Sequence, residues 1–251
     1  RPKMDLALKE HFLQIWGEYF PGAELPITFY YTDDPERGDR APPDGPHCII
    51  CELAKVRQGQ SLSFDVDRVR CPGARRYLGF ATEIRPNFAH FLSCGIPGEV
   101  RGERYKKSPE LVEQVLAQHP PFEAPGRYIV FKRWDALDES DRPAALIFFA
   151  RPDVLSGLFT LANFDTVEPA VIAPFASGCA SIVYHAFQER AAQRPRAILG
   201  MFDVSARPCV APDELTFSVP WEKFIRMVED VPESFLITPA WQKVQTRIEK
   251  E

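Results

Sequence analysis

Tyr128-Ile129-Val130-Phe131 and Ala145-Leu146-Ile147-Phe148-Phe149-Ala150 are the two segments of this chain that decide its fold. Both are short apolar runs rich in β-branched and aromatic residues, a composition that favours strands. From Tyr128 to the C-terminus, strands and helices are expected to alternate. We therefore predict an α/β or α+β fold in which a mixed β-sheet is flanked by helices.

The segments after these two strands have lengths that fit helical crossovers. The expected strands are 170–173, 197–202 and 215–219, and the expected helices are 153–163, 179–192, 220–230 and 238–250. Parallel strands need a connection of a dozen or more residues, which is commonly a helix. The spacing therefore allows βαβ units around 145–173 and 170–202.

The N-terminal half is expected to add helices and short strands to the same sheet. Apolar residues recur at helical spacing over 4–20, up to Pro21-Gly22, where a helix should end. The other expected elements are strands at 26–31 and 61–66, a loop at 32–46, and helices at 47–58, 71–79, 86–94 and 108–118. We expect one domain over 1–251, with a weak seam near 120–127.

Composition excludes several classes of protein. The chain has 30 basic and 35 acidic residues and a formal net charge of -5, which argues against a general nucleic-acid-binding protein. No apolar run approaches the roughly 20 residues of a membrane-spanning helix. Six cysteines in 251 residues are few for a disulfide scaffold. We expect a cytoplasmic protein whose partner is a small molecule rather than nucleic acid or a membrane, with self-association into a homo-oligomer left open.

The stretch His47-Cys48-Ile49-Ile50-Cys51 holds the first pair of candidate metal ligands. Cys48 and Cys51 are three residues apart, so on a helix both sulfurs lie on one face. Converging thiolates hold zinc or an iron–sulfur cluster. The alternative is that Cys51, between Ile50 and Leu53, packs in the core as a small apolar residue.

Cys71 and Cys179 are each expected to open a helix. Pro72-Gly73 follows the first of them, and Ser177-Gly178 precedes the second. The positive end of a helix and its free N–H groups stabilise a thiolate, so both residues are candidate ligands or reactive thiols. Each is equally compatible with a buried cysteine at a tight packing point. Cys94 is expected to be structural, and Cys209 is an outlying candidate for a missing ligand.

Asp203 and Arg207 follow the strand expected at 197–202. The ends of strands are where α/β folds place their sites, so these two residues are candidates for binding an anionic group of a cofactor or ligand. The alternative roles are turn capping and a surface ion pair. The chain contains no phosphate-binding loop, dinucleotide fingerprint, zinc-protease motif or nucleophile elbow, so whether it is an enzyme stays open.

Short motifs between about residues 40 and 230 link the chain to a known family. They are His47-Cys48, Cys71-Pro72-Gly73-Ala74 with Leu78-Gly79, Gly178-Cys179-Ala180, Leu199-Gly200 ahead of Ser205-Ala206-Arg207, and Asp213-Glu214-Leu215 with Val219-Pro220. In these motifs the chain resembles domain of unknown function family 169, the uncharacterised ArCR proteins of bacteria and archaea. The resemblance implies no particular activity, because none is established for the family.

The resemblance implies a shared set of thiols, which maps onto Cys48, Cys71 and Cys179. Some members of the family place a further cysteine where this chain has Met201. That departure leaves three thiols with an open or substituted fourth position, for which Cys51, His47 and Cys209 are candidates.

Three functions follow as hypotheses. The first is an iron–sulfur protein, with zinc as the alternative metal, because an all-thiolate set suits these centres and an open position can act on a substrate. The second is a metal-free thiol enzyme with Cys179 as nucleophile and a nearby histidine as base. The third is a small-molecule-binding module with an apolar pocket lined by phenylalanines, in which Arg207 or the pair Arg75-Arg76 holds an anion.

Overall fold

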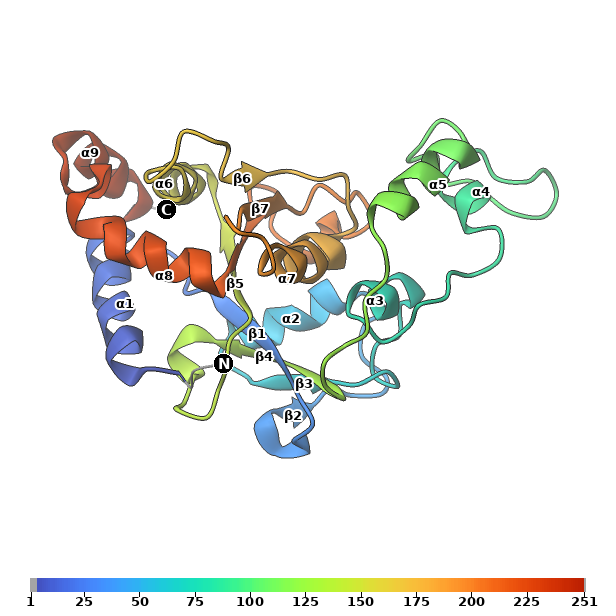
Figure 1. Cartoon of the computed structure of the whole chain (residues 1–251), viewed down its shortest axis with the longest axis horizontal. Helices are drawn as coiled ribbons and strands as arrows, with labels where there is room; N and C mark the ends of the chain where they lie inside the picture. The colour runs from blue at the N-terminus through green and yellow to red at the C-terminus, as the bar shows by residue number, and fades with distance from the viewer. Residues whose placement is uncertain (1–3, 251) are drawn as a thin grey trace.

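The computed structural model describes residues 4–250, in which helices cover both faces of an eight-stranded mixed sheet (Figure 1). The strands are β1 (Ile27–Thr32), β2 (Asp39–Arg40), β3 (Leu62–Phe64), β4 (Tyr128–Arg133), β5 (Ala145–Ala150), β6 (Val171–Ile172), β7 (Ala197–Gly200) and β8 (Leu215–Pro220). Their order in the sheet is β2-β3-β4-β1-β5-β8-β7-β6. The predicted mixed sheet is confirmed.

The two strands that decide the fold lie on either side of β1, in the middle of the sheet. β4 and β5 both pair antiparallel with β1, and Phe29 of β1 is opposite Phe131 in one pair and Ala145 in the other. β8 pairs with β5 along all six of its residues. The predicted seam at 120–127 leads directly into β4. The neighbours of β4 in the sheet are β3 and β1, which both come before the seam in the chain, so one sheet contains strands from both sides of the seam.

Parallel pairing occurs at the two edges of the sheet. β6 and β7 are parallel and are joined through a helix, as the spacing of 170–202 predicts. β5 and β6 also run in the same direction, but β8 and β7 lie between them. At the opposite edge, the two residues of β2 pair parallel with β3.

The helices are close to those predicted, with shorter ends. They are α1 (Leu6–Tyr19), α2 (Ile49–Arg57), α3 (Pro72–Tyr77), α4 (Phe88–Leu92), α5 (Pro109–Gln118), α6 (Pro152–Ala162), α7 (His185–Glu189), α8 (Trp221–Asp230) and α9 (Pro239–Ile248). Short helical turns are η1 (Pro35–Arg37), η2 (Trp134–Ala136), η3 (Ala180–Tyr184), η4 (Arg207–Cys209), η5 (Val231–Glu233) and η6 (Phe235–Ile237). Among residues 4–250, no helix has the length and apolarity needed to cross a membrane.

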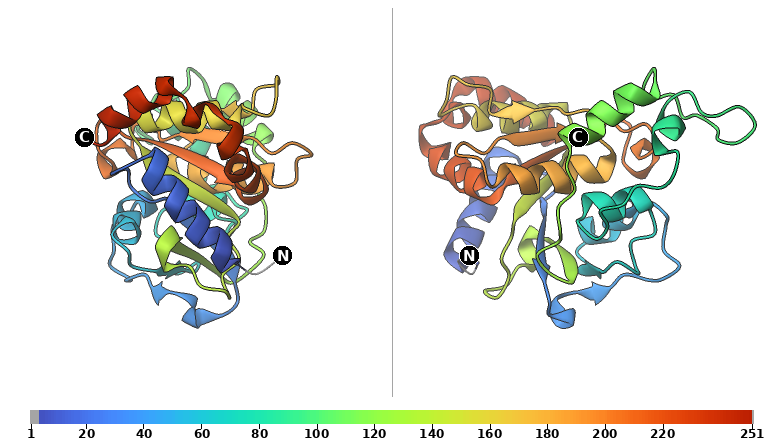
Figure 2. Two further views of the ribbon diagram at one scale, coloured as in Figure 1. Left: turned by 90° about the vertical axis from the view of Figure 1, so that its left-hand side faces the viewer. Right: turned by 45° about the vertical axis from the view of Figure 1, so that its right-hand side comes forward.

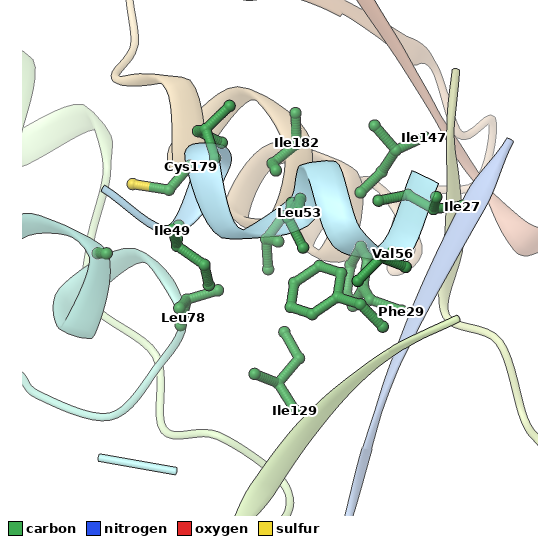
Figure 3. Packing of buried hydrophobic residues seen from close by; sticks show 14 of the residues in the cluster. Ile27, Phe29, Ile49, Leu53, Val56, Leu78, Ile129, Ile147, Cys179 and Ile182 are labelled. Atoms are coloured by element: carbon green, nitrogen blue, oxygen red, sulfur yellow. The ribbon is translucent and has the colours of Figure 1, made fainter. Parts of the chain in front are cut away.

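Alternate residues of the central strands divide the core into two layers, because successive side chains of a strand point to opposite faces. Ile147 of β5 packs with α2, α3 and α7, whereas its neighbours Leu146 and Phe148 pack with α1, α6, α8 and α9. The two groups of helices lie on opposite sides of the sheet in Figures 1 and 2. The layer of α2, α3 and α7 is the one that contains Cys179, and Figure 3 shows Cys179 among the buried apolar residues of this layer.

Local sequence explains where the helices begin and end. The Asp5 carboxylate accepts a hydrogen bond from the Ala7 N–H at 2.8 Å and caps α1. Gly59, with φ of +105°, ends α2 by donating its N–H to the Val56 carbonyl at 2.9 Å. Glycine adopts this left-handed conformation without a steric penalty, which explains why the helix expected at 47–58 ends here.

Two segments differ from the prediction. The loop expected at 32–46 contains η1 and β2, which are too short to produce a periodic pattern. The helix expected at 179–192 starts at Gly178 and contains η3, a π-helical turn, from Ala180 onward, and α7 ends at Glu189. π-Turns inside helices are rare and are frequent at functional sites.

Candidate functional site

Cys48, Cys71 and Cys179 each lie at the start of a helix, as the sequence predicts for Cys71 and Cys179. Cys48 is the N-cap of α2, Cys71 is the N-cap of α3, and Cys179 lies in the first turn of its helix, directly before η3. Cys48 and Cys71 are partly buried, and Cys179 is buried. All three pack against the same hydrophobic layer.

The three thiols lie close enough to interact electrostatically. Burial is the main cause that raises the pKa of Cys179, to about 12, and Cys71 and Cys48 raise it further. The pKa of Cys48 is raised first by burial and then by Cys71 and Asp203. Three segments that are distant in the sequence therefore bring their sulfurs into one cluster, which we call the thiol cluster.

Backbone and hydroxyl groups partly offset the cost of a thiolate in the thiol cluster. The N–H groups of Ile50 and Cys51, at the start of α2, lower the pKa of Cys48 without making a hydrogen bond of standard geometry to its sulfur. Ser177 Oγ lies 3.3 Å from Cys179 Sγ and lowers the pKa of that thiol. Burial still dominates at Cys179, so its thiol is protonated at neutral pH when nothing replaces the proton.

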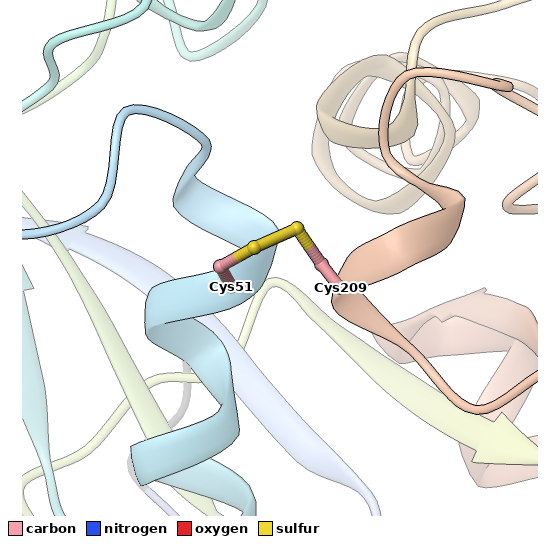
Figure 4. The surroundings of a disulfide bond; sticks show 2 residues. All are labelled: Cys51 and Cys209. Carbon is pink, nitrogen blue, oxygen red and sulfur yellow. A yellow bond between two sulfur atoms is a disulfide. The ribbon is translucent and has the colours of Figure 1, made fainter.

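Cys51, also a candidate ligand, is bonded to Cys209 instead of joining the thiol cluster. This disulfide ties the first turns of α2 to η4, and the two residues are 158 positions apart (Figure 4). The low cysteine content gave no indication of this bond. With both sulfurs occupied, neither residue offers a thiolate as a fourth ligand while the disulfide is intact. The other candidate, His47, is exposed.

Met201 occupies the position at which some relatives are expected to have a cysteine. Its side chain is buried, and its sulfur lies 3.4 Å from where a Cβ on Gly178, the residue before Cys179, would be. Its backbone has φ of +69°, which is uncommon for a residue with a side chain. The side chain at position 201 is therefore held next to the thiol cluster.

Asp203 and Arg207 are used by the loop that they belong to. The Asp203 carboxylate accepts hydrogen bonds from the Gly178 N–H at 2.9 Å and from the Ser205 N–H and hydroxyl at 3.0 and 2.7 Å. The Arg207 guanidinium donates to the backbone carbonyls of Glu214 at 2.5 Å and Ala211 at 2.9 Å. These contacts match the turn-capping alternative, and they hold Asp203 beside the thiol cluster.

Within residues 4–250, no three histidine, cysteine, aspartate or glutamate side chains converge closely enough to hold one metal ion. The thiols of the thiol cluster are near one another without forming such a group. Four tetrahedral zinc–sulfur bonds of about 2.3 Å would require sulfurs about 3.8 Å apart. A cluster of several irons binds each thiolate to a different iron and so tolerates wider separations.

A cavity of about 280 Å³ borders the thiol cluster. Its wall includes Gly73, Tyr77, Ser177 and Asp203. Ser177 contacts the Cys179 sulfur, and a Cβ on Gly73 would lie 3.7 Å from the sulfur of Cys71. Tyr77 has a pKa raised to about 12, by burial first and by Cys179 second.

The rest of the cavity is mostly aromatic and aliphatic. The sequence led to the hypothesis of a pocket lined by phenylalanines, but it did not indicate which residues would form it. Its walls come from α4, α5 and the two loops that precede η3 and η4. Phenylalanines scattered over these segments gave no local pattern, because only the fold brings them together. In Figure 1, α4 and α5 lie together at one end of the molecule, beyond α3.

The comparisons with known proteins agree with the motif-based resemblance. The family model for the uncharacterised ArCR proteins matches residues 23–230, which include all three thiols of the thiol cluster. Comparison with curated proteins and with solved structures found no match. The match covers most of the 251 residues, and the chain therefore belongs to domain of unknown function family 169, the ArCR family.

Proposed function

We propose that this protein binds an iron–sulfur cluster through Cys48, Cys71 and Cys179. The observation that supports the proposal is the approach of three thiols from three separate helix starts, close enough that Cys71 raises the pKa of Cys48 and that both raise the pKa of Cys179. Helix starts favour the thiolate form that iron requires. The all-sulfur donor set also suits iron–sulfur chemistry.

An iron–sulfur cluster demands less closeness of its thiolates than a single zinc ion does, because each thiolate binds a different iron. No three-residue group within residues 4–250 has the compact geometry of a single-ion site. Three thiolates would leave one position of a cubane without a protein thiolate. The cavity that borders the thiol cluster is the route that we propose for a ligand to that position. Met201 is the nearby soft side chain that could fill the position instead.

The experiment is anaerobic reconstitution with ferrous iron and sulfide, followed by iron and sulfide analysis, visible absorption and electron paramagnetic resonance. The wild-type chain is expected to retain both elements and to absorb in the visible range. Cys48→Ser, Cys71→Ser and Cys179→Ser should each lose roughly tenfold or more in iron affinity. The matched control is Cys94→Ser, because Cys94 is exposed and outside the thiol cluster.

Two outcomes would overturn the proposal. One is wild-type protein that retains neither iron nor sulfide under these conditions, or that retains zinc in their place. The other is equal loss of iron in Cys94→Ser and in the three thiol-cluster variants. Thermal unfolding of each variant separates loss of the cluster from loss of the fold.

A metal-free small-molecule-binding module is the second candidate, and the apolar cavity is the observation that favours it. A thiol enzyme using Cys179 has less support. A pKa of about 12 leaves almost no thiolate at neutral pH, and a nucleophile needs the thiolate.

A further inference from the structure

The cavity beside the thiol cluster has walls suited to a flat apolar ligand. Its volume of about 280 Å³ is near the lower end of the roughly 300–1,000 Å³ range of small-ligand sites. Six aromatic side chains contribute to the walls: Tyr77, Phe88, Phe91, Tyr105, Phe175 and Phe202. Aliphatic residues of α5 line the same cavity.

Several of these apolar side chains are exposed at the cavity. Phe175 is 50% exposed, Phe202 is 54% exposed and Val204 is 67% exposed. Single exposed apolar residues are ordinary, but three of them grouped on the loops of one cavity form a contiguous apolar wall. A ligand that covered them would remove apolar surface from water, which is favourable.

Three charged residues line the cavity, and Lys106 is the one cation among them. Both oxygens of Asp203 accept hydrogen bonds from Gly178 and Ser205. Glu103 is exposed to solvent. Lys106 is partly buried, and its ammonium lies 3.9 Å from the centroid of the Phe175 ring.

Lys106 has no anionic partner among the residues that the structure describes. Its ammonium interacts with the ring of Phe175 instead. A cation over an aromatic ring gains less than an ammonium bound to a carboxylate by charge-assisted hydrogen bonds. Lys106 therefore marks the one place in the cavity wall where a negatively charged group would be favoured. A single lysine balances a single negative charge, which fits a carboxylate better than a phosphate ester with its charge of about −1.5 to −2.

We propose that this cavity binds a small aromatic carboxylate, with its ring between the aromatic walls and its carboxylate on Lys106. The ring would make the offset or edge-on contacts that aromatic groups prefer. The proposal goes beyond the iron–sulfur function, because the residues that form the cavity are not the three thiols. The two proposals can therefore fail separately.

The test is isothermal titration of the full chain with 3-phenylpropanoate and with 3-phenylpropan-1-ol, which share the ring and differ in charge. The acid is expected to bind saturably and roughly tenfold more tightly than the alcohol, because only the acid pairs with Lys106. Lys106→Met and Lys106→Gln should lower the affinity for the acid to that for the alcohol. Lys107→Met is the matched control, because Lys107 is exposed and does not line the cavity.

Equal affinity for the acid and the alcohol would overturn the proposal, as would absence of saturation at millimolar concentration. Equal loss in the Lys107 and Lys106 variants would overturn it as well. Titrations are run before and after iron loading. If the protein binds the acid but takes up no iron, the iron–sulfur proposal is refuted and the carboxylate site is supported.

Discussion

His185 has its imidazole in the interior, where it is only 8% exposed. Its ring lies edge-on to that of His119, with the centroids 4.8 Å apart, and its Nε2 has no hydrogen-bond partner within residues 4–250. Burial first and His119 second lower the pKa of His185 to about 4, and Glu189 opposes them. The folded protein therefore holds this residue neutral, at the end of η3 that is farther from Cys179.

This buried histidine should make stability depend on pH. Between the ordinary pKa of 6.5 and the folded-state value of about 4, the unfolded chain binds a proton that the folded chain does not. The free energy of unfolding then rises with pH across that window. We expect the contribution of His185 to the free energy of unfolding to be complete above about pH 6.5. It should fall by about 3 kcal/mol as the pH is lowered towards 4, which urea unfolding can measure.

Replacing the titrating ring provides the control. His185→Gln should flatten the pH dependence between pH 4 and 6.5, whereas His11→Gln, at an exposed position of α1, should leave it unchanged. The pKa of His119 is lowered too, by burial and then by Arg76, so some dependence of the same sign should persist. A slope in His185→Gln equal to that of the wild type would refute the assignment.

α6 contacts its neighbours closely at Gly157. A Cβ at this position would come within 2.4 Å of Trp241 Cη2, from α9, and within 2.7 Å of Phe20 Cε1, after the end of α1. Both rings are buried, so neither moves away freely. The close approach of α6 to the two terminal helices therefore depends on the absence of a side chain.

Gly157→Ala and Gly17→Ala should have opposite effects on stability. Alanine is the better helix former by about 1 kcal/mol, and a Cβ at Gly17 in α1 would meet nothing within 4 Å. Gly17→Ala should therefore raise the free energy of unfolding by roughly 0.5–1 kcal/mol. Gly157→Ala should lower it by about 1–3 kcal/mol through overpacking, and a stabilised Gly157→Ala protein would disprove the close contact.

The disulfide connects α2 with η4 across a separation of 158 residues. A crosslink over so long a loop stabilises mainly by restricting the unfolded chain. Arg207, in the same turn, already holds the carbonyls of Ala211 and Glu214. The bond therefore fixes a loop with its own hydrogen-bond network to the helix that begins after Cys48.

Removing this bond should destabilise the protein by about 2–4 kcal/mol. The variant is Cys51→Ala with Cys209→Ala, measured by denaturant unfolding without reductant. Cys94→Ala is the control, because it removes a cysteine that is free and exposed. Dithiothreitol should lower the stability of the wild type by a similar amount and leave the double variant unaffected. An equal shift in both proteins would show that the bond does not form in solution.

Much of the architecture could be predicted from the sequence, because long apolar segments show their own periodicity. β4, β5 and β8 were expected within one or two residues of their observed bounds, and so were α5 and α6. β2 escaped prediction because two polar residues, Asp39 and Arg40, pair through their backbone alone. The order of strands was also out of reach, since the pairing of β8 with β5 depends on contacts far apart in the sequence.

The candidate site also has parts that could be predicted from the sequence and parts that could not. Each cysteine at a helix start could be found locally, from a preceding loop or a following proline, and the family motifs linked Cys48, Cys71 and Cys179. The bond between Cys51 and Cys209 could not be found, because no local pattern relates the two positions. The role of Lys106 was equally hidden, since its surroundings include Phe175, which lies on a distant loop.

The position of β8 between β5 and β7 also sets the order in which the chain can fold during synthesis. β6 and β7 are joined to the rest of the sheet through β8, so they stay detached until residues 215–220 have left the ribosome. Pairing between distant segments is slow, and unpaired apolar strands are prone to associate with other chains. β6 and β7 therefore need protection from the time they are synthesised, and the last strand, β8, determines when that protection can end.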